Sequence, residues 1–279
     1  MIIIKTISEI HEYISKIHDH KTIGFVPTMG SFHEGHISLI KKCVEENKES
    51  ICSLFVNPKQ FNEKEDYENY PCDLKKDIKI ISKTKCKVLF APSKEEIYPQ
   101  NNITKEYDFD GIEKILEGER RPGHFYGVGI ILEKLFDLIK PYNVYFGEKD
   151  FQQCVIVNKL IKQKFKKINL FTCKTIRDQK GLALSSRNRL LSFEEKQASC
   201  LIYENLVNAK KNHKKTSIQK IKQDIYEKLN SHELIKVEYV DIRKKNNFEV
   251  LKDFSRNDPA IILVAVKVGK IRLIDNITI

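Results

Sequence analysis

Short apolar runs alternate with amphipathic stretches along the first 175 residues of the chain. Within an amphipathic stretch the apolar residues recur three or four positions apart, as Ile37, Ile40 and Val44 do, which is the spacing of one helix face. The apolar runs predict strands, and the amphipathic stretches predict helices. The strands are expected at 22–28, 50–57, 87–93, 143–150 and 168–177. The helices are expected after the first strand, where Ile37, Ile40 and Val44 recur, and at 73–85, 127–141 and 151–165.

This alternation predicts an α/β fold, a Rossmann-like doubly wound parallel sheet with helices on both faces. Ligands of such sheets bind beyond the carboxyl ends of the strands. The pattern changes after GLALSSRNRLLS (181–192), where two helical stretches precede two strand-like runs, at 192–213, 217–230, 236–244 and 260–277. We therefore expect residues 1–175 to form the sheet domain and residues 176–279 to form a second, smaller α+β domain.

The composition is that of a folded protein without a membrane span. Of the 279 residues, 41% are hydrophobic and 31% are charged, which excludes wholesale disorder. The longest strongly apolar run, Ile261–Val266, is far shorter than the roughly 20 residues that a membrane helix needs. The first residues lack the apolar core and the cleavage site of a secretory signal. Seven cysteines without a C-x-x-C pair favour reduced thiols, so we expect a cytoplasmic protein with no membrane partner.

The chain is strongly basic, with a formal net charge of +11. That charge would suit nucleic acid, but much of it is lysine spread over helix-like segments such as 210–223. The sequence has no Trp and no cluster of aromatic residues between basic ones, which a surface that stacks bases would need. We therefore interpret the lysines as a solvated surface and expect no nucleic-acid partner, although a phosphate-bearing small molecule would gain from the positive field.

The segment FVPTMGSFHEGHISLI, residues 25–40, joins a predicted strand to a predicted helix. The first turn of a helix offers unpaired N–H groups and the positive end of the helix dipole, which suit a phosphate. Gly30 and Gly35 let a phosphate approach the backbone, and the imidazoles of His33 and His36 can donate hydrogen bonds to its oxygens. An arbitrary H-x-x-H is more often a pair of surface or capping histidines, and the spacing differs from the zinc-protease motif H-E-x-x-H. The preceding strand and the glycines favour the phosphate site.

Further motifs follow in order along nearly the whole chain. They are FVNPKQF (55–61), EDYENYP (65–71), FAPSKEEIYP (90–99), LEGERRPGHFYGV (116–128), YFGEKDFQQ (145–153), RDQKGLALSSRN (177–188) and GKIRLIDNI (269–277). With PTMGSFHEGH, which resembles the H-x-G-H element of the nucleotidylyltransferase superfamily, they resemble the pantothenate synthetase (pantoate–β-alanine ligase) family. Tyr126 stands where an arginine is common and Leu190 where a tyrosine is usual, and neither change touches the polar residues discussed next.

The resemblance implies an ATP-dependent, AMP-forming ligase that works in two steps. Pantoate attacks ATP to give an enzyme-bound pantoyl adenylate and pyrophosphate, and the amine of β-alanine then displaces AMP to give pantothenate. The catalytic residues that it implies are His36, His33, Lys149 and Arg187. The ATP-binding residues that it implies are Met29, Gly30, Ser31, Phe32, His33, Glu34, Gly35, His36, Gly147, Glu148, Lys149, Asp150, Ile176, Leu184, Ser185, Ser186 and Arg187. The smaller domain is expected to close over the ATP site.

The resemblance also places pantoate against Gln60 and Gln153, and β-alanine against Gln60 and Asn57. Mg²⁺ is expected as a cofactor with ATP, held through phosphates and water. Asp73 or Asp77 could contribute, but we assign no metal ligand. The family is usually a homodimer, so a homodimer is expected.

Each motif also fits a structural role when it is taken alone. The amides of FVNPKQF could satisfy a turn, GEKD could be a polar turn capped by Asp150, and LSSR (184–187) could be a serine-rich linker. Two other functions stay open, an adenylyl- or cytidylyltransferase that stops at a nucleotidylated product and a pseudo-enzyme that senses ATP. The second polar pocket at 55–61 favours the ligase over a simple transferase, and intact His36, Lys149 and Arg187 argue against a sensor.

Overall fold

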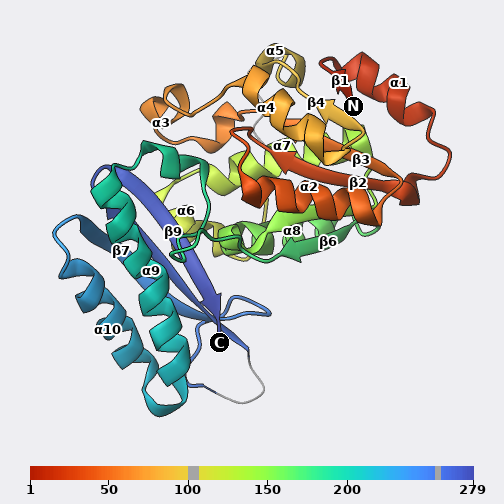
Figure 1. The fold of residues 1–279 in the computed structure, drawn as a ribbon. Helices are drawn as coiled ribbons and strands as arrows, with labels where there is room; N and C mark the ends of the chain where they lie inside the picture. Colours follow the sequence, from red (N-terminus) through yellow and green to blue (C-terminus); the bar gives the residue numbers. More distant parts are fainter. Residues whose placement is uncertain (100–106, 255–258) are drawn as a thin grey trace. The chain divides into compact units, whose positions relative to one another are not determined.

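The computed structural model describes residues 1–99, 107–254 and 259–279 (Figure 1). The chain divides into two units, each with its own core. The large unit contains residues 1–148 and 152–174, and the small unit contains residues 149–151 and 175–279. The short segment Lys149–Phe151 therefore belongs to the small unit, although the residues on both sides of it belong to the large one.

The large unit is built on a sheet of parallel strands. In chain order these are β1 (Ile2–Ile4), β2 (Ile23–Thr28), β3 (Glu49–Leu54), β4 (Val88–Phe90), β5 (Asn143–Gly147) and β6 (Asn169–Cys173). Their spatial order is β1-β4-β3-β2-β5-β6, and every neighbouring pair is parallel. The chain winds from β2 toward one edge and returns to place β5 on the other side of β2. The direction of winding reverses between these two strands, and such a switch point is where doubly wound sheets bind ligands.

Helices cover both faces of this sheet. The longer helices are α1 (Ile7–Ser15), α2 (Glu34–Glu46), α4 (Leu74–Ile81), α7 (His124–Ile139) and α8 (Phe151–Lys164), and the short ones are α3 (Lys64–Glu68), α5 (Lys94–Ile97) and α6 (Glu117–Arg120). Val26 of β2 packs in one cluster with Ile40 of α2, while its neighbour Phe25 packs edge-on against Phe136 of α7, with ring centroids 6.4 Å apart. Because successive strand side chains point to opposite faces, α2 and α7 lie on opposite sides. The predicted doubly wound α/β fold is confirmed.

The small unit packs two helices against an antiparallel sheet. Its main elements are α9 (Phe193–Asn212), α10 (Ile218–Asn230), β7 (Ile235–Lys244), β8 (Ala260–Val268) and β9 (Ile271–Thr278). The strand order is β7-β8-β9, and the hairpin between β8 and β9 turns at Gly269, whose φ is +55°. Figure 1 shows these five elements, and apolar residues from all of them share one core. The predicted α+β character is confirmed.

Two elements at the start of the chain are absent from the sequence-based expectation. Strand β1 has only three residues and pairs with β4 at the sheet edge, which is too short a run to show a period. Helix α1 begins with a capping box in which Thr6 accepts from the N–H of Glu9, so the pattern T-x-x-E is a local signal that indicates it. Among the helices of the described residues, none is long and apolar enough to cross a membrane.

Candidate functional site

A tight turn follows β2 and leads into α2. Gly30 has φ +80° and the buried Ser31 has φ +55°, a left-handed conformation that is unfavourable for a side chain with a Cβ. The carboxylate of Asp77 on α4 holds this turn, because its Oδ2 accepts from the N–H of Ser31 at 2.7 Å and its Oδ1 from the N–H of Phe32 at 2.8 Å. A Cβ on Gly30 would lie 2.8 Å from Asp77 Oδ2. The glycine therefore makes room for the carboxylate that holds the backbone.

The two histidines lie at the start of α2. His33 is the N-cap residue, and its Nδ1 accepts from the N–H of Gly35 at 3.1 Å. An accepting Nδ1 carries no proton, so the neutral ring has its proton on Nε2 and can donate from there. The ring of His36 lies 4.1 Å from the ring of His33, centroid to centroid. The structure thus brings the two imidazoles together on the first turn of a helix, beside the turn at Gly30.

A chain of buried side chains orients the amide of Gln60. Asn57 is 1% exposed; its Nδ2 donates to Gln60 Oε1 at 3.1 Å and to the carbonyl of Gly127 at 3.0 Å. Its Oδ1 accepts from the hydroxyl of Tyr98 at 2.8 Å and from the N–H of Lys59 at 3.3 Å. Burial raises the pKa of Tyr98, so this hydroxyl keeps its proton and donates. Since Oε1 of Gln60 accepts from Asn57, its Nε2 is the donor end.

The donor end of Gln60 faces the turn after β2. Gln60 Nε2 lies 3.0 Å from the sulfur of Met29, which is a weak acceptor. A carboxylate or hydroxyl oxygen of a ligand would be a far better acceptor for this N–H group. Gln60 is 7% exposed. Its contact with Met29 places the motif FVNPKQF beside the turn that precedes the H-x-G-H element. The sequence alone could not show that these two motifs are neighbours.

The backbone of Gln60 is held by the start of α7 and the loop before it. His124 Nδ1 donates to the carbonyl of Gln60 at 2.8 Å, and Arg121 Nη2 donates to the same oxygen at 3.3 Å. Arg121 Nη1 lies 3.2 Å from His124 Nε2, and because arginine can only donate, this nitrogen accepts and the His124 ring is neutral. A Cβ on Gly127 would lie 2.1 Å from the carbonyl oxygen of Lys59. Residues of RPGHFYG therefore pack against the backbone of FVNPKQF and hold it in place.

The two glutamines at the start of α8 have different surroundings. Gln152 is 3% exposed, donates to the carbonyls of Ile112 and Ile115, and accepts from the N–H of Glu117. These hydrogen bonds hold the backbone of residues 112–117, at the start of α6 and just before it. Gln153 points from another side of the helix and is half-buried. The contact of Gln153 with a ligand stays a prediction.

The carboxyl end of β5 lies at the switch point beside β2. Gly147 ends the strand, and its carbonyl accepts from Cys154 Sγ at 3.4 Å. Within the described part of the chain, no heavy atom beyond Gly147 and its two chain neighbours lies within 4 Å of the position that a Cβ on Gly147 would occupy. Glu148 follows and is half-buried. The backbone here is open to a ligand on the side where a side chain would otherwise stand.

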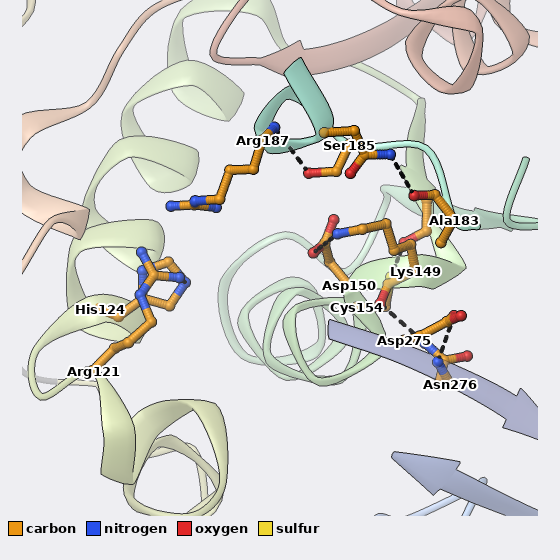
Figure 2. A network of polar contacts seen from close by, with 12 residues as sticks. Arg121, His124, Lys149, Asp150, Cys154, Ala183, Ser185, Arg187, Asp275 and Asn276 are labelled. Atoms are coloured by element: carbon orange, nitrogen blue, oxygen red, sulfur yellow. Dashed lines mark hydrogen bonds and ion pairs between the residues drawn. The ribbon is translucent and has the colours of Figure 1, made fainter. Parts of the chain in front are cut away.

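The other predicted ATP residues belong to the small unit. Lys149 has an 18% exposed side chain, and its Nζ lies 3.3 Å from Asp150 Oδ1 (Figure 2). Ile176 accepts from the N–H of Leu184 through its carbonyl at 2.9 Å. Ser185 caps a short 3₁₀ helix that holds Ser186 and Arg187, and its hydroxyl accepts from the N–H of Arg187 at 3.3 Å (Figure 2).

Comparison with known proteins agrees with this geometry. The family model for pantoate–β-alanine ligase matches residues 2–278. The chain belongs to the pantoate–β-alanine ligase family. It is 42% identical over 280 residues to the pantothenate synthetase of Azobacteroides pseudotrichonymphae, and the alignment covers 100% of both chains.

Solved structures of this family have the same fold. A pantothenate synthetase from Thermus thermophilus superposes with a TM-score of 0.92 at 33% identity, covering 99% of each chain. A pantoate–β-alanine ligase from Francisella tularensis, complexed with beta-gamma ATP and β-alanine, gives a TM-score of 0.84 at 38% identity and covers 99% of this chain and 97% of that one.

Asp73 and Asp77, the two carboxylates that could contribute to a metal site, both accept from backbone N–H groups. Across residues 1–99, 107–254 and 259–279, no group of three or more His, Cys, Asp or Glu side chains could hold a metal ion. Asp77 uses both oxygens on the backbone of the turn, and Asp73 accepts from the N–H of Lys76 as the N-cap of α4. Sequence reasoning missed this role of Asp77, because only the fold brings α4 beside the turn.

Proposed function

We propose that this protein joins pantoate to β-alanine in an ATP-dependent, AMP-forming reaction through a pantoyl adenylate. The family match over residues 2–278 carries the proposal. It is supported by the donor groups at the switch point of the sheet, since a carboxylate attacking the α-phosphate needs fixed donors around a growing negative charge rather than a covalent nucleophile.

In this proposal His33 and His36 donate to oxygens of the reacting phosphate. The tautomer of His33 leaves its N–H at Nε2, the end of the ring away from its bond to Gly35. The turn 29–32 and the start of α2 would cradle the phosphates with backbone N–H groups, and Glu34 and Gly35 would border the nucleotide. Gly147 and Glu148 would border it from the end of β5.

The small unit would supply the positive charge for the leaving group. Lys149 is proposed to bind the triphosphate beside Asp150, and Arg187 with the hydroxyls of Ser185 and Ser186 to hold the departing pyrophosphate. The backbones of Ile176 and Leu184 would line the adenine. We propose that residues 176–279 close over ATP during the reaction, which would exclude water from the adenylate.

Gln60 is proposed to bind pantoate through its Nε2 donor, with Gln153 as a second contact. The same amide would then border β-alanine. Asn57 would serve β-alanine by holding Gln60, because all four of its hydrogen-bonding positions have protein partners. Gln60→Ala should raise the KM for pantoate more than the KM for ATP. An equal rise in both KM values would remove Gln60 from the pantoate site.

We propose Mg²⁺ as the divalent cation, held mainly by the phosphates of ATP and by water. Omitting Mg²⁺ while keeping ATP should abolish activity, and titration with other divalent ions tests its identity. A homodimer is also proposed, and light scattering after size exclusion tests it. All seven cysteines are free thiols, which supports a cytoplasmic location, and fractionation of the source cells would test it.

The deciding experiment measures AMP and pyrophosphate with pantoate and ATP, with and without β-alanine. The ligase should release AMP over many turnovers only when β-alanine is present, and pantothenate should form in equal amount. AMP release at the same rate without β-alanine would count against the ligase. A nucleotidylated product that accumulates without AMP would favour the transferase alternative, and the absence of any ATP turnover would favour the sensor.

A further inference from the structure

Parts of two sequence motifs have no role in the proposed function. They are Arg177 in RDQKGLALSSRN and the pair Asp275–Asn276 in GKIRLIDNI, which lie about a hundred residues apart. All three residues are partly or fully buried in the small unit, and the side chains of Arg177 and Asp275 contact each other and the backbone of Asn276 (Figure 2 shows Asp275 and Asn276).

The segment Lys149–Phe151 has two anchors in the small unit. The side chain of Asn276 on β9 donates from Nδ2 to the carbonyl oxygen of Lys149 at 2.9 Å (Figure 2). The ring of Phe151 stacks on that of Phe248, with centroids 6.1 Å apart and an interplanar angle of 30°. Both rings are buried, with 6% and 2% exposure. These contacts explain why the segment belongs to the small unit.

Asn276 is itself held in place. It is 5% exposed, its N–H donates to Asp275 Oδ1 at 2.8 Å, and its carbonyl accepts from Arg177 Nη2 at 3.3 Å. Asp275 is 4% exposed and binds Arg177 with both oxygens, Oδ2 to Nη1 at 2.5 Å and Oδ1 to Nη2 at 2.8 Å. A bidentate pair of this kind fixes both position and angle. The residue whose side-chain amide donates to the Lys149 carbonyl is therefore itself fixed by its backbone bonds to Arg177 and Asp275.

The same guanidinium supports the loop that carries Arg187. Arg177 Nη1 also donates to the carbonyl of Gly181 at 3.1 Å, and its guanidinium carbon lies 3.7 Å from the ring centroid of Tyr203. Arg177 also pairs with Ala183 as an isolated antiparallel bridge, directly before the segment 184–187. The Arg177–Asp275 ion pair thus contacts both Asn276, which binds the Lys149 carbonyl, and the turn at Gly181 before Arg187.

We propose that Asn276, supported by the Arg177–Asp275 pair, is a positioning residue that fixes Lys149 relative to the 184–187 loop. Lys149 and Arg187 then move as one body with the small unit, so that both cations reach the triphosphate together. The inference rests on the role of Lys149 in the proposed function. Asn276 acts through the backbone of Lys149 and touches no reacting atom.

A test that does not depend on catalysis uses amide hydrogen exchange of the intact protein. Asn276→Ala removes the donor to Lys149, so exchange in a peptide covering 148–152 should become several-fold faster. Asn276→Asp keeps the size of the side chain but cannot donate, and it should behave in the same way. The matched control is Asn205→Ala, because Asn205 is also buried in the small unit and donates to a backbone carbonyl, that of Leu201. The control should leave exchange at 148–152 unchanged.

The kinetic test is a double-mutant cycle on single-turnover formation of the adenylate with enzyme in excess. Asn276→Ala should slow this step by about 5- to 10-fold, the effect of one lost hydrogen bond, and leave the KM for pantoate unchanged. In a Lys149→Ala background the same substitution should change the rate by less than about 2-fold, because the ammonium group that the bond positions is gone.

Two results would overturn the inference. One is exchange at 148–152 in both Asn276 variants that matches the wild type, and the other is an equal fold-loss with and without Lys149. A Lys149→Ala enzyme of full activity would instead overturn the proposed role of Lys149, while the exchange result still reports on the anchor.

Discussion

The carboxylate of Asp77 is predicted to hold the turn 29–32 after β2, and Asp77→Asn tests this with the smallest change of shape. Its two oxygens accept from the N–H groups of Ser31 and Phe32 at 2.7 and 2.8 Å, and the side chain is 1% exposed. An asparagine keeps one accepting oxygen and turns an NH₂ group toward the other N–H. One buried donor then loses its acceptor, and the remaining bond is no longer assisted by charge.

The magnitude follows from these bonds. A hydrogen bond to a charged group contributes about 1.5–3 kcal/mol and a neutral one about 1 kcal/mol, while a buried donor without an acceptor costs about 1–3 kcal/mol. The lower cost of burying a neutral amide offsets part of the loss. We therefore expect the free energy of unfolding to fall by about 2–3 kcal/mol. The turn should also loosen, because Ser31 at φ +55° costs about 1–2 kcal/mol in that conformation and needs a partner to stay there.

Urea denaturation followed by far-UV circular dichroism measures the first effect, since the chain has no Trp. The KM for ATP measures the second and should rise by about 10-fold if the turn loses roughly 1.4 kcal/mol of its preorganisation. Asp73→Asn is the matched control on the same helix, because Asp73 is an exposed N-cap residue and Asn caps a helix equally well. Equal stability and equal KM for ATP in the two variants would refute the role of Asp77.

Three further predictions concern the other parts of the site. Tyr98→Phe removes the donor to Asn57 Oδ1 and should raise the KM for pantoate by about 5- to 10-fold. The KM for ATP should stay within about 2-fold. Steady-state kinetics measure both, and an unchanged KM for pantoate would contradict the prediction. His36→Ala should slow adenylate formation by about 100-fold or more at unchanged melting temperature, and wild-type kinetics would remove His36 from the mechanism. Gly127→Ala should lower the free energy of unfolding by several kcal/mol, at least about 3, because its Cβ would lie 2.1 Å from the carbonyl oxygen of Lys59; a melting temperature within error of wild type would contradict this.

Local patterns were enough to predict most of the fold. Helices α2 and α7 follow the helical spacing of their apolar residues, and the strand–helix alternation predicted the parallel sheet. The order of the motifs identified the family. These features are visible in sequence because each depends on residues close together in the chain or on a pattern of known order.

The tertiary structure alone decided which side chains support the site. Asp77 lies 46 residues from Ser31, Tyr98 lies 41 from Asn57, and Asn276 lies 127 from Lys149. No local spacing can predict such pairs, because they form only when separate strands and helices pack together. The sequence by itself determined most of the elements, their order and the chemical groups available. Packing decided which end of the Gln60 amide donates, which carboxylate holds the turn, and which residues hold Lys149, since a buried polar group takes its role from the partners that surround it.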